Sequence, residues 1–295
     1  MDNILVTIIV ASYNAEKYIE ETLESCINQS YKFIQIIIAD DCSKDNSVEI
    51  IESWLNDKKE THPDIECIFV RSQENRGIPA NFNNGLKHAK GKWIKCIGSD
   101  DILLNDAVEK FIQELNGIPS GQNYGAFFTY FETFGNDIVL SSKYPLSWTR
   151  DISKMRPSKF KQGLANIHFN NMAPGAFINR KYFTEFDERY RLLEDLPHWL
   201  KLIDNNIKTD FLDFTSVLYR VHNAQATSRN SNINVYLYKD LVFLNEMRLS
   251  DKHYVAYLHN KLNLYLSFNN IRYFKYLKVL NPMNVIIALY EKVRR

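Results

Sequence analysis

The sequence predicts an α/β fold in which a parallel sheet is covered by helices on both faces, followed by a C-terminal helical extension. Two observations predict it. The first hundred residues alternate short β-branched apolar runs with segments whose apolar residues recur at helical spacing. The runs are continuous, as in strands that are buried on both faces. Strand–helix–strand repetition of this kind gives parallel strands, because each crossover helix packs on a face of the sheet.

The individual elements follow from the same two periods. The predicted strands are 4–10, 34–39, 65–70, 93–97, 125–131, 176–179 and 211–221. The predicted helices are 19–27, 48–55, 82–89, 108–115, 196–203, 236–247, 254–268 and 271–280. Ser43 or Asp45 is placed to cap the helix that begins near residue 48. The pattern loosens beyond residue 120 and changes again near 228–232.

Composition excludes several classes of protein. The chain has 295 residues, of which 45% are hydrophobic and 24% charged, so it is neither disordered nor collagenous. Its net charge of +1 gives no basic face for bulk nucleic-acid binding. The four cysteines show no CxxC pair, which favours free thiols in a reducing cytosol over disulfides or a zinc site: Cys26, Cys42, Cys67 and Cys96. We expect no signal peptide and no membrane-spanning helix.

Polar residues follow three of the predicted strands. They are Ser12-Tyr13-Asn14, Asp40-Asp41 and Asp100-Asp101. The carboxyl ends of parallel strands lie at one edge of the sheet, and ligands of such sheets bind beyond that edge. The sequence therefore predicts one site built from these three loops.

Two acidic pairs in these loops each allow two interpretations. Adjacent carboxylates at Asp100-Asp101 suit a divalent cation held between them and a phosphate, but either acid could instead cap the helix that follows. Asp40-Asp41 could accept hydrogen bonds from a base or a ribose, or could serve a turn. Neither GxxxxGK[ST] nor GxGxxG follows the first strand, which argues against a P-loop kinase and a dinucleotide dehydrogenase.

The motifs, taken in order, resemble a known family. They are ASYNAEKYIEETLESCINQS (11–30), IIIADDCSKDNS (36–47) and ENRGIPANFNNGLKHAKGKWIKCIGSDD (74–101). Over residues 4–228 the chain is similar to family 2 glycosyltransferases with the GT-A fold, a Rossmann-like nucleotide-binding sheet. The resemblance implies a glycosyltransferase domain over 1–228, with a nucleotide-sugar half at 1–103 and an acceptor half at 104–228. Residues 229–295 would then form the C-terminal helical region.

The resemblance also assigns roles in donor binding. Tyr13 would stack on the uracil of a UDP-sugar, and Asp41 would hydrogen-bond to that base. The full nucleotide-binding set that it implies is Ser12, Tyr13, Asn14, Asp41, Asn75, Asn83 and Asp100. Asp101 would hold Mn²⁺ or Mg²⁺. His222 would be a further ligand of this metal or a contact to the departing diphosphate, and Arg220 would face the diphosphate.

Two positions depart from the family pattern. Gly98 stands where the family often has the first acid of Asp-Ser-Asp-Asp, and Phe82 stands where an Arg often precedes the helix Asn. The first departure removes one carboxylate from the site, and the second puts one phosphate or sugar contact in doubt. The histidine assignment also has a competing interpretation, since a lone histidine after a strand, as at position 222, is usually structural or faces solvent.

The segment LLEDLPHWL (192–200) is similar to the family's E-D-x-x-x-W segment. An inverting transferase needs a carboxylate to take the proton of the acceptor hydroxyl. The resemblance makes Asp195 this base and Glu194 an auxiliary or donor-sugar contact. Read without the resemblance, Glu-Asp before a proline is typical of a helix N-terminus, where the helix dipole favours acids.

The favoured hypothesis is therefore a metal-dependent, inverting hexosyl- or N-acetylhexosaminyltransferase of bacterial surface polysaccharide synthesis (O-antigen or capsule). Its donor would be a nucleotide-sugar and its acceptor a glycan or a polyprenyl-diphosphate-linked sugar. A sugar-phosphate nucleotidyltransferase would want a Gly-rich, basic loop after the first strand, and residues 11–17 do not provide one. A non-catalytic nucleotide-sugar-binding subunit of a polysaccharide assembly complex is the alternative, and Gly98 is the feature that favours it.

The last 25 residues predict a cytoplasmic protein that contacts the inner face of the membrane. Residues 271–295 hold six Lys or Arg and one acid, Glu291, with aromatic and aliphatic side chains between them. Such a stretch suits an anionic headgroup layer, at roughly 1 kcal/mol for each basic residue. The alternative is that these helices pack on the catalytic domain or on a second copy of the chain.

Overall fold

The computed structural model describes residues 4–119, 122–135, 142–145, 150, 172–222 and 234–250, together with 257, 258, 260–262 and 264. The described residues fall into two compact units. The first holds the sheet and ends at His222, and the second holds α8 (Val235–Ser250) and helical residues between 257 and 264. The predicted boundary at 228–232 and the stretch 271–295 lie outside the described residues.

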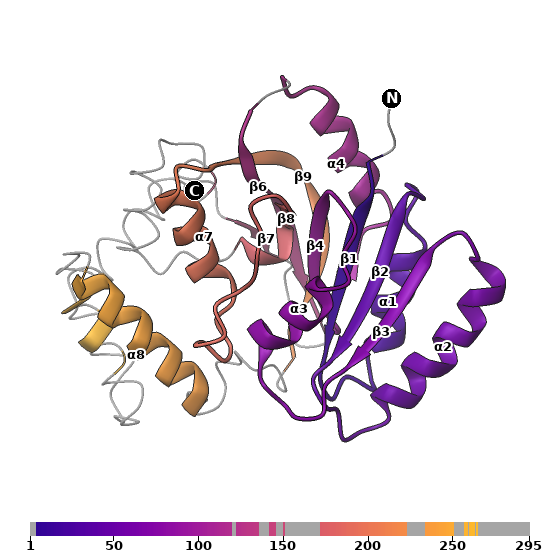
Figure 1. The fold of residues 1–295 in the computed structure, drawn as a ribbon, viewed down its shortest axis with the longest axis horizontal. Helices are drawn as coiled ribbons and strands as arrows, with labels where there is room; N and C mark the ends of the chain where they lie inside the picture. The colour runs from indigo at the N-terminus through magenta and orange to yellow at the C-terminus, as the bar shows by residue number, and fades with distance from the viewer. Residues whose placement is uncertain are drawn as a thin grey trace. The chain divides into compact units, whose positions relative to one another are not determined.

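The first half of the sheet is parallel, as predicted. Its strands are β1 (Val6–Ser12), β2 (Ile34–Asp40), β3 (Glu66–Arg71) and β4 (Trp93–Gly98). They lie in the order β3-β2-β1-β4, and every pairing among them is parallel (Figure 1). β1 and β2 are almost wholly buried, which explains their unbroken apolar sequence.

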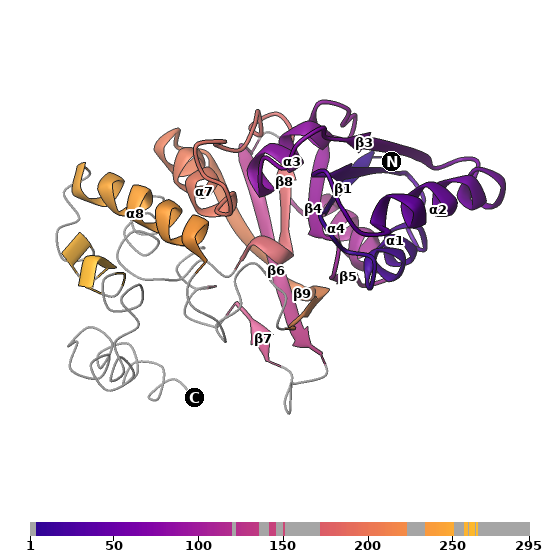
Figure 2. The same cartoon turned by 90° about the horizontal axis from the view of Figure 1, so that it is seen from below.

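The second half of the sheet is mixed. Its strands are β5 (Ile102–Leu103), β6 (Tyr124–Phe134), β7 (Lys143–Tyr144), β8 (Ala176–Asn179) and β9 (Lys208–Arg220). The sheet continues as β4-β8-β6-β9-β5, with antiparallel β4–β8, β8–β6 and β9–β5 pairs and a parallel β6–β9 pair. Figure 2 shows β6 running well past the end of β8, with β7 beside its far part. The far end of β9 pairs with β5, the short strand that follows the carboxyl end of β4.

Helices cover both faces of the sheet, as predicted. The even-numbered side chains of β1 and β2, such as Ile8 and Ile36, share one apolar core with α1 (Ile19–Ile27), α2 (Ser47–Thr61) and α4 (Ala107–Asn116).

The opposite face of the sheet carries α3 and α7. Here α3 (Ile78–Leu86) lies so close that a Cβ on Gly85 would come within 2.7 Å of Ile9 Cγ2. α7 (Asp195–Asp204) packs on this face too, with the Trp199 ring edge-on to Phe128 at 4.9 Å. Both helices lie in front of the sheet in Figure 1.

The expectation of free thiols is confirmed. All four cysteines are free. In the described part of the chain, no helix combines the length and the apolar character that a bilayer crossing requires.

Candidate functional site

Strand register brings the three predicted loops to one edge of the sheet. Ser12 and Asp40 are paired at the ends of β1 and β2, and Gly98, which ends β4, pairs with Ala11. Beyond this edge lies Tyr13, whose side chain is 48% exposed although it is large and aromatic. An exposed ring beside buried acids suits stacking on a planar base.

Asp41 is buried and faces the loop between β3 and α3. Its two carboxylate oxygens accept the backbone N–H groups of Arg76 (2.9 Å) and Gly77 (2.8 Å). Burial raises the pKa of Asp41, and these two hydrogen bonds oppose the rise. The neighbouring Asp40 carboxylate accepts the N–H and hydroxyl of Ser43, so it organises its own turn. Asp41 is thus fixed in place by the loop it faces.

Ser12 and Asn14 shape the first loop. Asn14 adopts a positive φ of 50°, and its side-chain oxygen accepts the N–H of Lys44 at 2.8 Å. The Ser12 hydroxyl is buried and has no hydrogen-bond partner among the described residues. The carbonyl of Ser12 accepts Asn81 Nδ2 at 3.2 Å. These contacts connect the loop after β1 to the loop after β2 and to α3.

The acids after β4 occupy different surroundings. The Asp100 carboxylate is partly exposed, and its Oδ2 lies 2.9 Å from His222 Nε2. Asp101 is buried, and its Oδ1 accepts the backbone N–H of Arg220 at 2.9 Å. The helix α4 begins after Asp106, so neither acid is at its N-cap. The structure therefore brings Asp100, rather than Asp101, to the histidine.

Arg220, predicted to face the diphosphate, holds the acidic turn. Its Nε donates to the carbonyl oxygen of Asp100 at 2.8 Å, and its guanidinium forms an ion pair with Glu21. The guanidinium lies between two rings, 4.6 Å from Tyr18 and 4.4 Å from Phe134. Stacking and the planar fork of donors make this a rigid support for the turn.

Lys95 is a fully buried cation on β4 that the sequence motifs do not single out. Its ammonium donates to the carbonyl of Pro174, within the 3₁₀ turn Ala173–Gly175, and to that of Ala176, the residue after the turn. Burial lowers its pKa to about 8. Burial and the nearby Asp100 raise the pKa of Asp101 well above its usual value, and the Lys95 charge opposes that rise. The buried Lys95 charge thus opposes protonation of Asp101.

The Asp100 carboxylate and the His222 imidazole are ligand types that fit a divalent cation. No group of three or more His, Cys, Asp or Glu gathers as a metal site within the described residues. Mg²⁺ and Mn²⁺ nevertheless bind through one or two protein ligands when phosphate oxygens supply the others. Asp100 Oδ2 and His222 Nε2 already face each other at 2.9 Å. A Cβ on Gly98 would lie 2.9 Å from Asp100 Oδ1, so a side chain at position 98 would displace this carboxylate.

Glu194 and Asp195 stand at the start of α7. Asp195 is the first residue of the helix and is buried, and its Oδ1 accepts the N–H of Leu196 at 2.8 Å. Glu194 occupies the N-cap position without a capping bond from its side chain. These positions are compatible with both interpretations of the sequence, a helix-dipole acid and a catalytic base.

The α7 helix is anchored by an unusual buried histidine. The His198 ring lies among the rings of Phe183, Phe186 and Trp199, at 4.8, 5.5 and 5.2 Å. Neither ring nitrogen has a hydrogen-bond partner among the described residues. Burial lowers the pKa of His198 to about 3, so the imidazole stays neutral in the folded protein.

Asn75 and Asn83, both predicted to bind the nucleotide, contact residues 186–191. Asn83 is buried, and its amide exchanges two hydrogen bonds with the backbone of Phe186, at 2.7 and 2.9 Å. The side-chain oxygen of Asn75 accepts Arg191 Nη2. Both amides thus help to hold residues 186–191 against α3 and the loop before it.

Comparison with known proteins identifies the family. The family model described as Glycosyl transferase family 2 matches residues 7–187, which is more than half of the chain. The chain belongs to glycosyltransferase family 2. This family 2 glycosyltransferase therefore has the enzyme class that the sequence motifs imply.

Curated relatives include members with and without an assigned reaction. An uncharacterized glycosyltransferase of Methanocaldococcus jannaschii is 28% identical over 227 residues, which cover 76% of this chain and 73% of the relative. WfaP of Escherichia coli, a UDP-Glc:α-D-GlcNAc-diphosphoundecaprenol β-1,3-glucosyltransferase, is 28% identical over 74% of this chain and 78% of its own. An uncharacterized glycosyltransferase of Haemophilus influenzae is 39% identical, but that match spans only about half of the relative (52%).

Solved structures confirm the GT-A fold. Residues 1–349 of S. aureus TarS superpose with a TM-score of 0.60 at 18% identity, over 91% of this chain and 74% of TarS. The TarS complex with UDP-GlcNAc gives a TM-score of 0.62 at 18% identity, over 89% of this chain and 73% of TarS. The mannosyltransferase PcManGT of Pyrobaculum calidifontis, in complex with GDP-Man and Mn²⁺, gives 0.55 at 17% identity, over 98% of this chain and 79% of its own.

Replacing Lys95 by Met should destabilise the protein by about 3 kcal/mol, because the buried Asp101 carboxylate loses the neighbouring charge and two carbonyls lose their donor. Urea unfolding at pH 7 measures the effect. Lys92→Met is the matched control, since Lys92 is exposed beside the same strand. Equal stability of the two variants would contradict a charge-compensating role for Lys95.

Replacing His198 by Phe should protect the protein against mild acid. The folded pKa is about 3 and the unfolded pKa about 6.5, so protons bind the unfolded state as pH falls below 6.5 and stability is lost there. Between pH 7.5 and 5.5 the wild type should lose about 1.4 kcal/mol more than His198→Phe. Denaturant unfolding at the two pH values measures this difference, and parallel losses in both proteins would show that His198 is not held neutral.

Proposed function

We propose that this family 2 glycosyltransferase moves a sugar from a UDP-sugar to a glycan or lipid-linked acceptor with inversion, assisted by a divalent cation. One observation carries the proposal: the partly exposed Asp100 carboxylate faces the His222 imidazole at 2.9 Å, at the sheet edge that also presents Tyr13 and Asp41. Such an edge suits one nucleoside diphosphate, because an aromatic ring is available for its base and a cation site for its phosphates.

In this proposal Tyr13 stacks on the uracil and Asp41 accepts a hydrogen bond from it. Asp100 and His222 hold the cation, and Asp101, assigned to the metal from the sequence, instead fixes the turn through Arg220. The cation, Mn²⁺ or Mg²⁺, supplies charge neutralisation for the departing diphosphate. The geometry that supports this revision is the contact of Asp101 with the Arg220 backbone and of Asp100 with His222.

Asp195 is the proposed general base. It takes the proton of the acceptor hydroxyl as the hydroxyl oxygen forms a bond to the anomeric carbon, while the bond from that carbon to the UDP oxygen breaks on the opposite face. The products are the glycosylated acceptor and UDP, and the proton stays on Asp195 until solvent removes it. Glu194, the adjacent acid, is placed to contact the donor sugar or to assist Asp195.

The names of the relatives support the substrate class. WfaP is named as a glucosyltransferase that uses UDP-Glc and a diphosphoundecaprenol-linked GlcNAc. TuaG of Bacillus subtilis, 34% identical over 109 residues, is named as a putative teichuronic acid biosynthesis glycosyltransferase. By analogy, we propose a polyprenyl-diphosphate-linked acceptor in surface polysaccharide synthesis, O-antigen or capsule. That acceptor would place the enzyme at the inner face of the membrane, where residues 271–295 would bind anionic lipid.

A non-catalytic binding subunit is the second candidate, because Gly98 removes an acid from the family motif. Asp195→Asn separates the two. The amide keeps shape but cannot take a proton, so release of UDP from a UDP-sugar with Mn²⁺ should fall at least about a hundredfold while UDP affinity is kept. Asp213→Asn, an exposed acid on β9, is the control. A wild type that binds the donor but releases no UDP is the result expected of a binding subunit.

Removing each acid after β4 distinguishes the two metal assignments. Asp100→Ala should abolish the Mn²⁺-dependent part of UDP binding, measured by calorimetry with Mn²⁺ and with EDTA, because it removes one of the two proposed ligands. Asp101→Ala should instead lower the melting temperature, since the Arg220 N–H loses its buried acceptor. If only Asp101→Ala loses the Mn²⁺ dependence of UDP binding, then Asp101 and not Asp100 is the metal ligand.

A further inference from the structure

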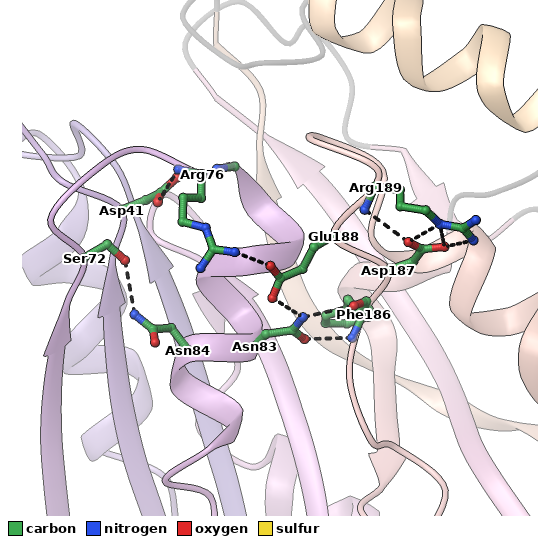
Figure 3. Close-up of polar contacts among 10 residues, drawn as sticks. Asp41, Ser72, Arg76, Asn83, Asn84, Phe186, Asp187, Glu188 and Arg189 are labelled. Carbon is green, nitrogen blue, oxygen red and sulfur yellow. Dashed lines mark hydrogen bonds and ion pairs between the residues drawn. The ribbon is translucent and has the colours of Figure 1, made fainter.

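The segment before α7 is fastened to the loop between β3 and α3. Figure 3 shows Asn83 on α3 reaching Phe186 and Glu188. Besides its two bonds to the Phe186 backbone, Asn83 Nδ2 donates to Glu188 Oε1 at 3.0 Å. The other oxygen of Glu188 pairs with Arg76 at 2.5 Å, although both side chains are well exposed. This outer part of the contact is solvated, so it contributes little by itself.

The inner part of the contact centres on Arg191. The Arg191 carbonyl accepts the N–H of Ile78 at 2.9 Å. Its guanidinium donates to the carbonyl oxygen of Asn75 at 3.0 Å and to the Asn75 side-chain oxygen at 2.5 Å. Arg191 therefore binds residues 75–78 through its backbone and its side chain.

Gly77 shows how closely the two segments approach. Its φ of 94° lies in the region that favours glycine, and a Cβ there would come within 2.3 Å of the Arg191 carbonyl oxygen. The same residue donates its N–H to Asp41. One loop is thus held by Asp41 on one side and by Arg191 on the other.

The chain from Arg191 to Asp195 is short. Four residues span at most about 14 Å when fully extended, so fixing Arg191 restricts where Asp195 can lie. The next turn of α7 is fixed by the same segment, because His198 packs on Phe183 and Phe186. A displacement of about 1 Å at a reacting group can cost about a hundredfold in rate.

We propose that Arg191 is a positioning residue that sets Asp195 against the nucleotide site, by joining the Asp41-bound loop to the start of α7. The inference rests on the proposed function, because it assumes that Asp195 is the base. It goes further in naming a residue outside the binding site whose loss impairs turnover more than donor binding.

Arg191→Met tests the proposal. We expect kcat for UDP release to fall at least about tenfold, while the affinity for UDP with Mn²⁺ changes less than about threefold. Arg191→Lys should recover only part of kcat, because one nitrogen, Nη2, donates to both Asn75 oxygens from the end of a side chain that is longer and stiffer than that of lysine. Arg189→Met is the matched control. It removes the same charge from the same segment, where Arg189 pairs with Asp187 two residues away.

Asn75→Ala provides a second route, because it removes the side-chain acceptor while leaving the backbone of Arg191 in place. In the double variant with Arg191→Met the losses in kcat should not add, as expected for residues that act through one contact. If Arg191→Met fails to fold, Asn75→Ala alone carries the test.

The proposal is overturned if Arg191→Met loses no more kcat than Arg189→Met, or if its kcat and UDP affinity fall in the same ratio. Failure of the proposed function looks different: the wild type itself would release no UDP from any UDP-sugar. In that case no variant could show a selective loss of turnover, and the positioning role falls with the function.

Discussion

The site depends on one buried interaction, in which the Asp101 carboxylate accepts the backbone N–H of Arg220. This bond joins the turn after β4 to the end of β9, two segments about 120 residues apart in the chain. It holds the Asp100 carboxylate beside the His222 imidazole, which lies two residues beyond the end of β9. Burial raises the pKa of this carboxyl group, and the charges of Lys95 and Arg220 oppose that rise. The partly exposed Asp100–His222 pair, the proposed cation site, is thus positioned by the hydrogen bond between Asp101 and Arg220.

The sequence predicts the nucleotide half of this arrangement well because its signals are local. Continuous apolar runs identify β1 and β2, and the register of parallel strands then dictates that Ser12 and Asp40 share an edge. The local sequence cannot decide which of Asp100 and Asp101 lies at the proposed cation site, since two adjacent acids are equivalent until a distant strand contacts one of them. Lys95 is missed for the same reason: a lysine inside an apolar strand shows its partner, the turn at Pro174, only after folding.

The segment before α7 is linked to α3 and the loop before it through backbone and amide contacts rather than through charge alone. Asn83 and Arg191 carry no catalytic signature, and the family resemblance led us to expect Asn75 and Asn83 at the nucleotide. Their partners lie more than a hundred residues away, beyond the reach of periodicity. Gly77 is the one local clue, because a glycine followed by a proline-containing helix start predicts a turn with unusual backbone angles. The segment before α7 therefore meets the loop between β3 and α3 at Gly77, where no side chain separates the two.

The central claim is that Asp100 and His222 together hold the cation that faces the diphosphate. Pulsed electron paramagnetic resonance of Mn²⁺ bound with UDP tests it directly, because a coordinating imidazole gives a nitrogen coupling that changes on ¹⁵N-histidine labelling. The account predicts this coupling in the wild type, its loss in His222→Gln, and weaker Mn²⁺ binding in Asp100→Asn. Mn²⁺ that binds with UDP but shows no histidine nitrogen coupling in the wild type would contradict the account.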